Sequence, residues 1–314
     1  MHFFERFAVP YHAGICYSGF RDGQAPGQSY PSYEEVKEDL LLLAPHWKYL
    51  RLYDCDAMAR TTLEVIRQEG MDFKVMLGAY ITAEINNPDC PWEAGVYEPA
   101  QLEKNKKDND ARIQTLADWG NEYSDIIFAL SVGNEACVDW TDHAVAPERV
   151  LAFVETVKKR AKQPVTFCEN YVPWYPKLAA VAAAVDFISI HTYPLWENKT
   201  IAEALAYTIA NFESVAQRYP GKPVVISEAG WATSANGRGF NPALANQDNQ
   251  FSYYHALQDW CRANQVLCFF FEAFDEAWKG SDHPLEPEKH WGLYYTNRVP
   301  KITAARLEST THLA

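Results

Sequence analysis

Short apolar runs of strand length alternate along this sequence with longer stretches whose apolar residues recur at helical spacing. The alternation occurs eight times. The predicted strands span residues 12–18, 49–54, 73–80, 126–135, 164–170, 187–193, 223–231 and 266–275. The predicted helices span residues 33–44, 57–69, 110–123, 147–161, 176–184, 201–219 and 243–264, with a last one after Pro300. Residues 187–190 and 224–226 are apolar on both faces or nearly so, as buried parallel strands require.

Eight buried strands that alternate with helices predict an α/β fold of the (β/α)8 TIM-barrel type, as a single catalytic domain over residues 1–314. An open doubly wound sheet is the alternative. That fold would need a glycine-rich phosphate turn after the first strand, and residues 18–23 have neither its spacing nor an immediately following helix. Length alone leaves the domain count open, but no low-complexity linker divides the chain.

Composition excludes several classes of protein. With 48% hydrophobic and 22% charged residues, the chain should fold compactly. Its 28 basic and 41 acidic residues give a net charge of −13, which repels nucleic acid and anionic membrane surfaces. No apolar run approaches the roughly 18 residues of a membrane span. We therefore expect no nucleic-acid or membrane partner. We also expect a monomer. No export signal is visible in the first ten residues, so the expected location is cytoplasmic, or periplasmic or secreted if a leader has been removed.

The seven cysteines show neither a paired Cys-x-x-Cys spacing nor a nearby His-x-x-x-His partner. Four of them fall within or beside apolar runs and are interpreted as reduced core residues: Cys16, Cys55, Cys168 and Cys268. We therefore predict no structural metal and no cofactor.

Polar side chains gather at the carboxyl ends of the predicted strands, where the active site of such a barrel lies. Acids and aromatics dominate this set, which comprises Tyr17, Arg51, Asp54, Tyr80, Asn134, Glu135, Glu169, Asn170, His191, Tyr193, Glu228, Trp231, Glu272, Asp275 and Glu276. Acids that face a common axis repel one another, so their gathering indicates a positively charged transition state or a metal. A metal hydrolase would ordinarily supply several histidines here, whereas only His191 is present. Paired carboxylates with aromatic rings instead match cleavage of glycosidic bonds.

Two segments carry a resemblance to a known family: Ser-Val-Gly-Asn-Glu at residues 131–135 and Val-Ile-Ser-Glu-Ala-Gly-Trp at residues 225–231. They resemble the signature segments of glycoside hydrolase family 17, the β-1,3-glucanase family of the retaining barrel clan, in a bacterial-type member. Residues 14–17, 51–54 and 192–194 resemble the first, second and sixth strands of that family. Residues 274–279 and 288–294 resemble its eighth-strand pattern, so the resemblance runs from residue 14 to residue 294.

The resemblance implies that Glu228 is the nucleophile and Glu135 the general acid/base of a retaining mechanism. Glu228 must stay ionised, so we expect a hydrogen bond from a neighbour such as Tyr193 and a nearby cation, Lys279. Glu135 must arrive protonated at neutral pH. Retention further predicts carboxyl groups about 5–5.5 Å apart, against roughly 6.5–9.5 Å for inversion. Asn134 would bond the sugar 2-hydroxyl, as its counterpart does in the clan.

The remaining predicted substrate-binding residues have two possible roles each. Glu276, Lys279 and Glu288 resemble the charged cluster of the family, which serves either as a substrate clamp or as a structural ion-pair network. Tyr17, Trp231 and Trp278 are candidate sugar contacts, with core packing as the alternative, and Tyr193 completes the set. Arg51 and Asp54 are expected to orient other groups.

The predicted activity is that of a β-1,3-glucanase of the glucan endo-1,3-β-glucosidase type, acting on laminarin or its oligosaccharides. Glucanosyl transfer through the same intermediate is the alternative. A noncatalytic glucan-binding protein would lose one carboxylate, but both are present. Departures from the family pattern include His191 in place of a frequent asparagine and an extra aromatic, Trp196. The loop of residues 86–101 could close one end of a cleft, which disfavours endo action on long glucan.

Overall fold

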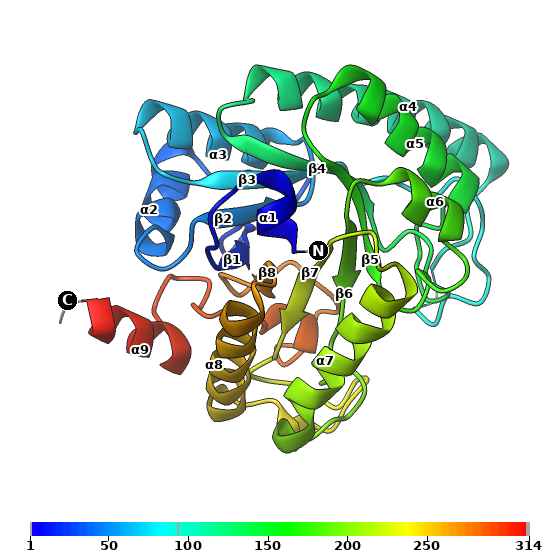
Figure 1. Cartoon of the computed structure of the whole chain (residues 1–314). Helices are drawn as coiled ribbons and strands as arrows, with labels where there is room; N and C mark the ends of the chain where they lie inside the picture. Colours follow the sequence, from blue (N-terminus) through cyan, green and yellow to red (C-terminus); the bar gives the residue numbers. More distant parts are fainter. Residues whose placement is uncertain (1, 93, 312–314) are drawn as a thin grey trace.

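A computed structural model describes residues 2–92 and 94–311 of the chain. Eight parallel strands close into a barrel in chain order, so the predicted (β/α)8 architecture is confirmed (Figure 1). The strands are β1 (Gly14–Cys16), β2 (Tyr49–Leu52), β3 (Lys74–Gly78), β4 (Ile127–Asn134), β5 (Val165–Asn170), β6 (Ile188–His191), β7 (Val224–Gly230) and β8 (Cys268–Phe271). Each lies within its predicted range and is shorter, and in every strand but β5 the last residues predicted as strand belong to the loops above the barrel.

The helices surround the barrel (Figure 1). They are α1 (Phe3–Phe7), α2 (Tyr33–Leu43), α3 (Ala57–Gln68), α4 (Pro99–Glu122), α5 (Pro147–Arg160), α6 (Ala179–Ala184), α7 (Ile201–Arg218), α8 (Gln247–Asn264) and α9 (Ile302–Thr311), with short 3-10 turns η1 (Pro242–Leu244) and η2 (Pro287–Lys289). Helix starts follow the predicted signals. Ser32 and Glu35 form a capping box at α2, and Pro147 occupies the first turn of α5.

Helix α4 differs most from its prediction. It begins at Pro99, whereas the sequence predicts a start at residue 110. The added turns are polar, so they lack the apolar periodicity from which the prediction was made. They are helical nonetheless, with ion pairs between neighbouring turns such as Lys104–Asp108. The last three residues of the predicted loop 86–101 therefore belong to the helix.

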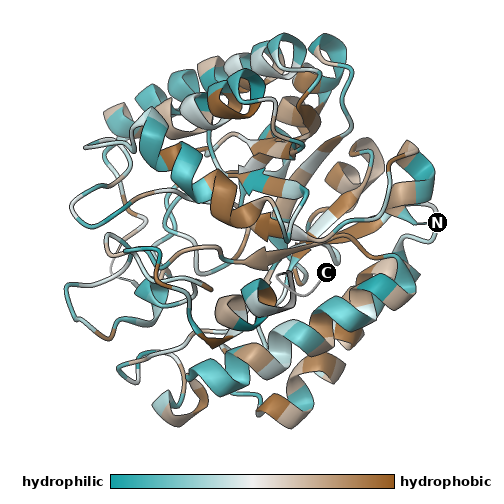
Figure 2. Cartoon of the chain, turned by 90° about the vertical axis from the view of Figure 1, so that its left-hand side faces the viewer, coloured by the Kyte–Doolittle hydropathy of each residue, from teal (hydrophilic) through white to brown (hydrophobic). Residues whose placement is uncertain are grey.

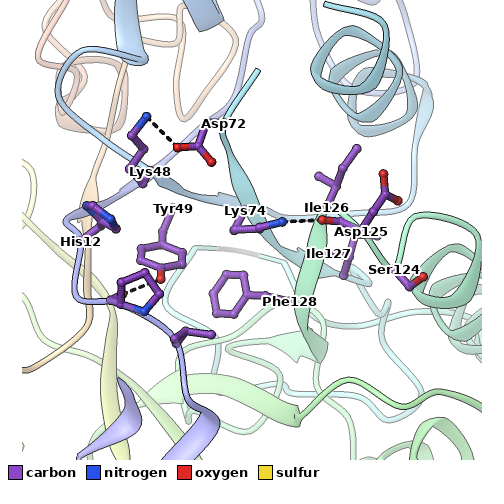
Figure 3. A pocket seen from close by; sticks show the side chains of 12 residues that line it. His12, Lys48, Tyr49, Asp72, Lys74, Ser124, Asp125, Ile126, Ile127 and Phe128 are labelled. Carbon is purple, nitrogen blue, oxygen red and sulfur yellow. Dashed lines mark hydrogen bonds and ion pairs between the residues drawn. The ribbon is translucent and has the colours of Figure 1, made fainter. Parts of the chain in front are cut away.

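The amino-terminal end of the barrel is covered by α1, a helix that the sequence did not predict. The Phe3 ring lies 6.0 Å from that of Phe128 and 4.9 Å from that of Phe187, which stand at the starts of β4 and β6. A cavity of about 330 Å³ lies beside this end and is drawn in Figure 3. Its charged lining is internally paired, with Lys48 3.1 Å from Asp72. The catalytic candidates lie at the other end.

The strands carry mainly hydrophobic residues, and the outer turns of the helices are more hydrophilic (Figure 2). All seven cysteines are free thiols; Cys55 is half-buried, whereas Cys16, Cys168 and Cys268 are buried as predicted. Within residues 2–92 and 94–311, no helix has both the length and the apolar character needed to cross a bilayer.

Candidate active site

The two predicted catalytic carboxylates stand at the carboxyl ends of β4 and β7. Glu228 lies within β7, and Glu135 directly follows the last residue of β4. Gly133 lies two residues before Glu135. A Cβ at this position would come within 2.8 Å of Ile81 and 2.9 Å of Phe167, so a larger residue would displace the side chains around it. Glu135 itself has a positive φ of 45°, which is uncommon outside glycine. The backbone at Glu135 is therefore locally strained where it positions the Glu135 side chain.

Irregular strand pairing aims these side chains into the barrel mouth. The register between β4 and β5 shifts between Ser131 and Asn134, just before Glu135. The pairing of β6 with β7 shifts between Ile190 and His191. The pairing of β7 with β8 shifts between Ile226 and Ala229. Such irregularities change the direction of a strand and redirect the side chains that follow.

Glu135, His191 and Glu228 converge on one point. Nδ1 of His191 lies 2.8 Å from Oε1 of Glu135 and 3.3 Å from Oε2 of Glu228. One carboxylate oxygen of each glutamate lies within 4.8 Å of the other. This proximity is close to the spacing of about 5–5.5 Å found in retaining glycosidases and shorter than that of inverting ones.

Glu228 is held in its ionised form. Its carboxylate pairs with Arg51 and accepts hydrogen bonds from the Tyr53 hydroxyl at 3.0 Å and the Tyr193 hydroxyl at 2.5 Å. Burial opposes ionisation, but the charges of His191 and Arg51 and the bond from Tyr193 outweigh it and lower the pKa of Glu228 to about 2. The predicted bond from Tyr193 is therefore present.

The prediction that Lys279 is the cation beside Glu228 was wrong. Lys279 lies 3.1 Å from Glu272 and pairs with Glu276, and the cations at Glu228 are Arg51 and His191. The sequence analysis had placed Arg51 and His191 at strand ends, but their distance from Glu228 depends on the closure of the barrel.

His191 is fully buried between the two glutamates. Burial favours its neutral form, but Glu228, Cys168 and Glu135 together raise the pKa of His191 to about 10. The imidazole is therefore protonated at neutral pH, and its bond to Glu135 carries a transferable proton. The sequence singled out His191 as a departure from the family pattern and assigned it no role.

Asn134 is half-buried at the end of β4, and its Oδ1 accepts a hydrogen bond from Arg51. This bond leaves the amide nitrogen as the donor available for substrate, which is compatible with the predicted contact to a sugar hydroxyl. Arg51 thereby links Asn134 and Glu228, as the orienting role predicted for it requires.

The charged cluster near β8 is an internally paired network. Glu276 is buried and accepts hydrogen bonds from Ser18 and, at 2.9 Å, from Nε1 of Trp278. Burial and the adjacent Glu276 raise the pKa of Glu272 well above its ordinary range, and Lys279 pairs with both carboxyls. Glu288 is half-buried, and burial is the main cause that raises its pKa to about 7. These contacts favour the ion-pair role over the substrate clamp for Glu276 and Lys279.

The three aromatic candidates lie in different surroundings. Tyr17 is fully buried and donates a hydrogen bond to Asp39 at 3.1 Å, and Trp231 is fully buried with its Nε1 bonded to the carbonyl of Leu244. Neither side chain reaches the surface, which favours packing roles for both. Trp278 is 40% exposed and can offer a ring face to a sugar.

Glu135, His191 and Glu228 could together hold a metal ion, as judged by their ligand atoms alone. The charges around them oppose it, because Arg51 already neutralises Glu228 and His191 is itself protonated. We therefore expect prolonged treatment with EDTA to leave the hydrolysis rate unchanged. Loss of activity that a divalent ion restores would contradict this prediction.

Arg51→Gln is expected to move the acidic limb of the pH profile to higher pH. Loss of the cation raises the pKa of Glu228 from about 2 towards its ordinary value, so protonation would inactivate this predicted nucleophile at a higher pH. The profile of kcat/KM against pH measures the shift. Arg149→Gln is the matched control, because Arg149 binds the buried Glu84 away from the site. An unmoved limb in the Arg51 variant would contradict the assignment.

Comparison with known proteins agrees with this geometry. Residues 14–292 match the model of the BtgE/BtgC glycoside hydrolase domain. The chain belongs to this glycoside hydrolase family. A glucan 1,3-β-glucosidase of Arthroderma benhamiae is 26% identical over 296 residues, which cover 90% of this chain and 86% of that protein. A probable glucan endo-1,3-β-glucosidase of Aspergillus flavus is 28% identical, over 84% of this chain and 38% of its own length.

Two solved structures share the barrel. The crystal structure of an endo-laminarinase from Formosa Hel1_33_131 superposes with a TM-score of 0.81 at 25% identity, covering 95% of this glycoside hydrolase and 87% of that chain. A glycoside hydrolase family 17 β-1,3-glucanosyltransferase from Rhizomucor miehei superposes with a TM-score of 0.70 at 21% identity, covering 93% and 96%. The family resemblance predicted from the motifs is confirmed, whereas the bacterial type stays a prediction.

Proposed function

We propose that this protein is a retaining β-1,3-glucanase that acts by double displacement through Glu228 and Glu135. The observation that carries the proposal is a pair of carboxylates in different surroundings whose facing oxygens lie within 4.8 Å of each other. Glu228 is held ionised by two cations and two tyrosine hydroxyls, while Glu135 is 25% exposed and bonded to protonated His191. The glucan substrate is inferred from the relatives, which are glucan 1,3-β-glucosidases and a laminarinase.

In the first step the ionised Glu228 attacks the anomeric carbon and forms a glycosyl ester. The bond to the leaving sugar breaks, and the hydrogen-bonded pair of Glu135 and His191 supplies the proton that its oxygen takes up. Ester formation removes the charge of Glu228. Arg51 and the two tyrosine hydroxyls then remain directed at the carboxyl group, so they can stabilise its return as a leaving group.

In the second step Glu135 acts as base and takes a proton from water that attacks the same carbon. The ester breaks, Glu228 is released ionised, and the product keeps its original β configuration after two inversions. The proton taken up restores the protonated Glu135–His191 pair for the next cycle. The facing oxygens of the two carboxylates lie within 4.8 Å of each other, below the roughly 6.5–9.5 Å separation that seats a water in inverting enzymes, so direct inversion is disfavoured.

Proton NMR during hydrolysis of laminarihexaose tests this mechanism. We expect the β-anomer of the new reducing end to appear first and to equilibrate slowly with the α-anomer. First appearance of the α-anomer would contradict a retaining mechanism. Absence of any hydrolysis of β-1,3-linked oligosaccharides would contradict the assigned substrate.

Glucanosyl transfer is a second function of the same intermediate, in which an acceptor hydroxyl replaces water. The exposed ring of Trp278, bonded to Glu276 in the network beside the site, could seat such an acceptor. Mass spectrometry of the products from laminarihexaose separates the two outcomes, since transfer yields chains longer than the substrate. Trp278→Ala is expected to decrease the fraction of longer products if this ring binds the acceptor, and an unchanged fraction would exclude that role.

A further inference from the structure

Two loops from opposite sides of the barrel meet above its mouth. The loop after β3 carries Trp92, and the loop after β7 carries Arg238. Because three strands lie between β3 and β7 in either direction around the closed eight-stranded barrel, these loops start on opposite sides. The Arg238 guanidinium nevertheless lies over the Trp92 ring, 4.5 Å from its centroid. We call this contact, together with its anchor Glu286, the mouth bridge.

Arg238 is fixed in this position by a buried carboxylate. Its Nε lies 3.0 Å from Oε1 of Glu286, whose side chain is fully buried in the loop after β8. The other oxygen of Glu286 accepts a hydrogen bond from Ser281 at 2.7 Å. A buried carboxylate that lost Arg238 would be strongly destabilised, so Arg238 is held towards Glu286 and the barrel mouth.

The loop that carries Trp92 is tied to its neighbour, the loop after β4. The Asn87 amide donates hydrogen bonds to the carbonyls of Asp139 at 2.9 Å and Thr141 at 2.7 Å. The Tyr97 hydroxyl donates to the carbonyl of Asp142 at 2.9 Å. These bonds make the loops after β3 and β4 one continuous wall on the side of Glu135.

The loop that carries Arg238 is tied to the loop after β6 in the same way. The backbone N–H of Asn241 donates to the side-chain oxygen of Asn198 at 3.0 Å. Gly239 packs against Trp196 so closely that a Cβ would come within 2.2 Å of the ring, and its φ of 85° also favours glycine. These contacts form the opposite wall, on the side of Glu228.

Packed aromatic rings link the loop that carries Arg238 to the catalytic residues. The Trp196 ring, against which Gly239 packs, lies 6.1 Å from the ring of Trp291, and Trp291 lies 5.1 Å from the ring of Tyr193. Tyr193 in turn binds Glu228. Continuous packing therefore connects the residue after Arg238 to the nucleophile.

We propose that the mouth bridge makes this enzyme act from the ends of glucan chains, with an unbranched free end as its substrate. The inference rests on the proposed function. A glucan held for cleavage passes between Glu135 on the β4 side and Glu228 on the β7 side. The bridge joins nearly the same two sides, so it crosses the path of the glucan. A chain without an accessible end cannot enter sideways, and one with a free end can be threaded up to or under the bridge.

Dye-crosslinked insoluble β-1,3-glucan tests the inference, because soluble dye appears only after internal cuts. The readout is dye release divided by the turnover of laminarihexaose, a short substrate with free ends. We expect a low ratio for the unmodified enzyme and a several-fold higher ratio for Trp92→Ala, which removes the half-exposed ring that Arg238 contacts. Arg238→Lys is the second variant, since it keeps a charge for Glu286 and removes the planar stack.

Arg218→Ala is the matched control, because its guanidinium also lies over an aromatic ring, Tyr175, at 4.8 Å, but on the outer surface at the end of α7. Its ratio should equal that of the unmodified enzyme. If neither the unmodified enzyme nor any variant hydrolyses laminarihexaose, the proposed function is overturned. If they hydrolyse it but the unmodified enzyme has a ratio of dye release to turnover as high as that of Trp92→Ala, only the proposed role of the mouth bridge is overturned.

Discussion

Glu228→Gln is expected to lower kcat on laminari-oligosaccharides by roughly 10⁴-fold, the scale of loss when a member of a catalytic unit is removed. The glutamine amide keeps the size of the side chain but cannot form the glycosyl ester. Steady-state kinetics measure the loss, and calorimetric titration with laminarihexaose checks that the variant still binds sugar. Unchanged turnover would remove the nucleophile assignment.

The control for this variant is Glu84→Gln. Glu84 is also buried and also bound by an arginine, with its Oε2 2.6 Å from Nε of Arg149, but it lies outside the site. This control distinguishes the effect of removing any buried carboxylate from the effect of removing the nucleophile.

Azide given to Glu228→Ala should yield an α-glycosyl azide from an activated substrate, because a single displacement inverts the anomeric carbon.

Glu135→Ala is expected to lower kcat on laminari-oligosaccharides by about 10²- to 10⁴-fold, the range that general acid–base catalysis contributes. The loss should be much smaller for formation of the ester from a dinitrophenyl β-glycoside, because that leaving group needs no proton. Burst kinetics measure ester formation, and steady-state rates measure its hydrolysis. Equal losses on both substrates in the burst phase would contradict the acid role.

Azide also distinguishes the two glutamates. In Glu135→Ala the nucleophile is intact, so azide attacks the glycosyl ester and yields a β-glycosyl azide. This product is the opposite of that expected from Glu228→Ala. The same anomer from both variants would contradict the division of roles that the different surroundings of the two carboxylates support.

The roles of the charged residues show where sequence reasoning stops. The family resemblance of the segment with Glu276 and Lys279 implied a cation beside Glu228. In the folded chain Lys279 is occupied by Glu272 and Glu276, and Arg51 on β2 crosses the barrel interior to Glu228. Which cation reaches which carboxylate depends on barrel radius and side-chain direction, and neither is encoded in a local pattern.

The sequence by itself determined the barrel, because eight buried apolar runs between helical segments leave few other ways to cover both faces of a parallel sheet. It also determined which strand ends carry Glu135 and Glu228. Only the tertiary structure decided that His191 lies between them, since this contact joins the ends of β4, β6 and β7, which meet only in the closed barrel. The contact of Trp92 with Arg238 likewise depends on the tertiary structure, because loops distant in sequence meet only once the barrel has closed.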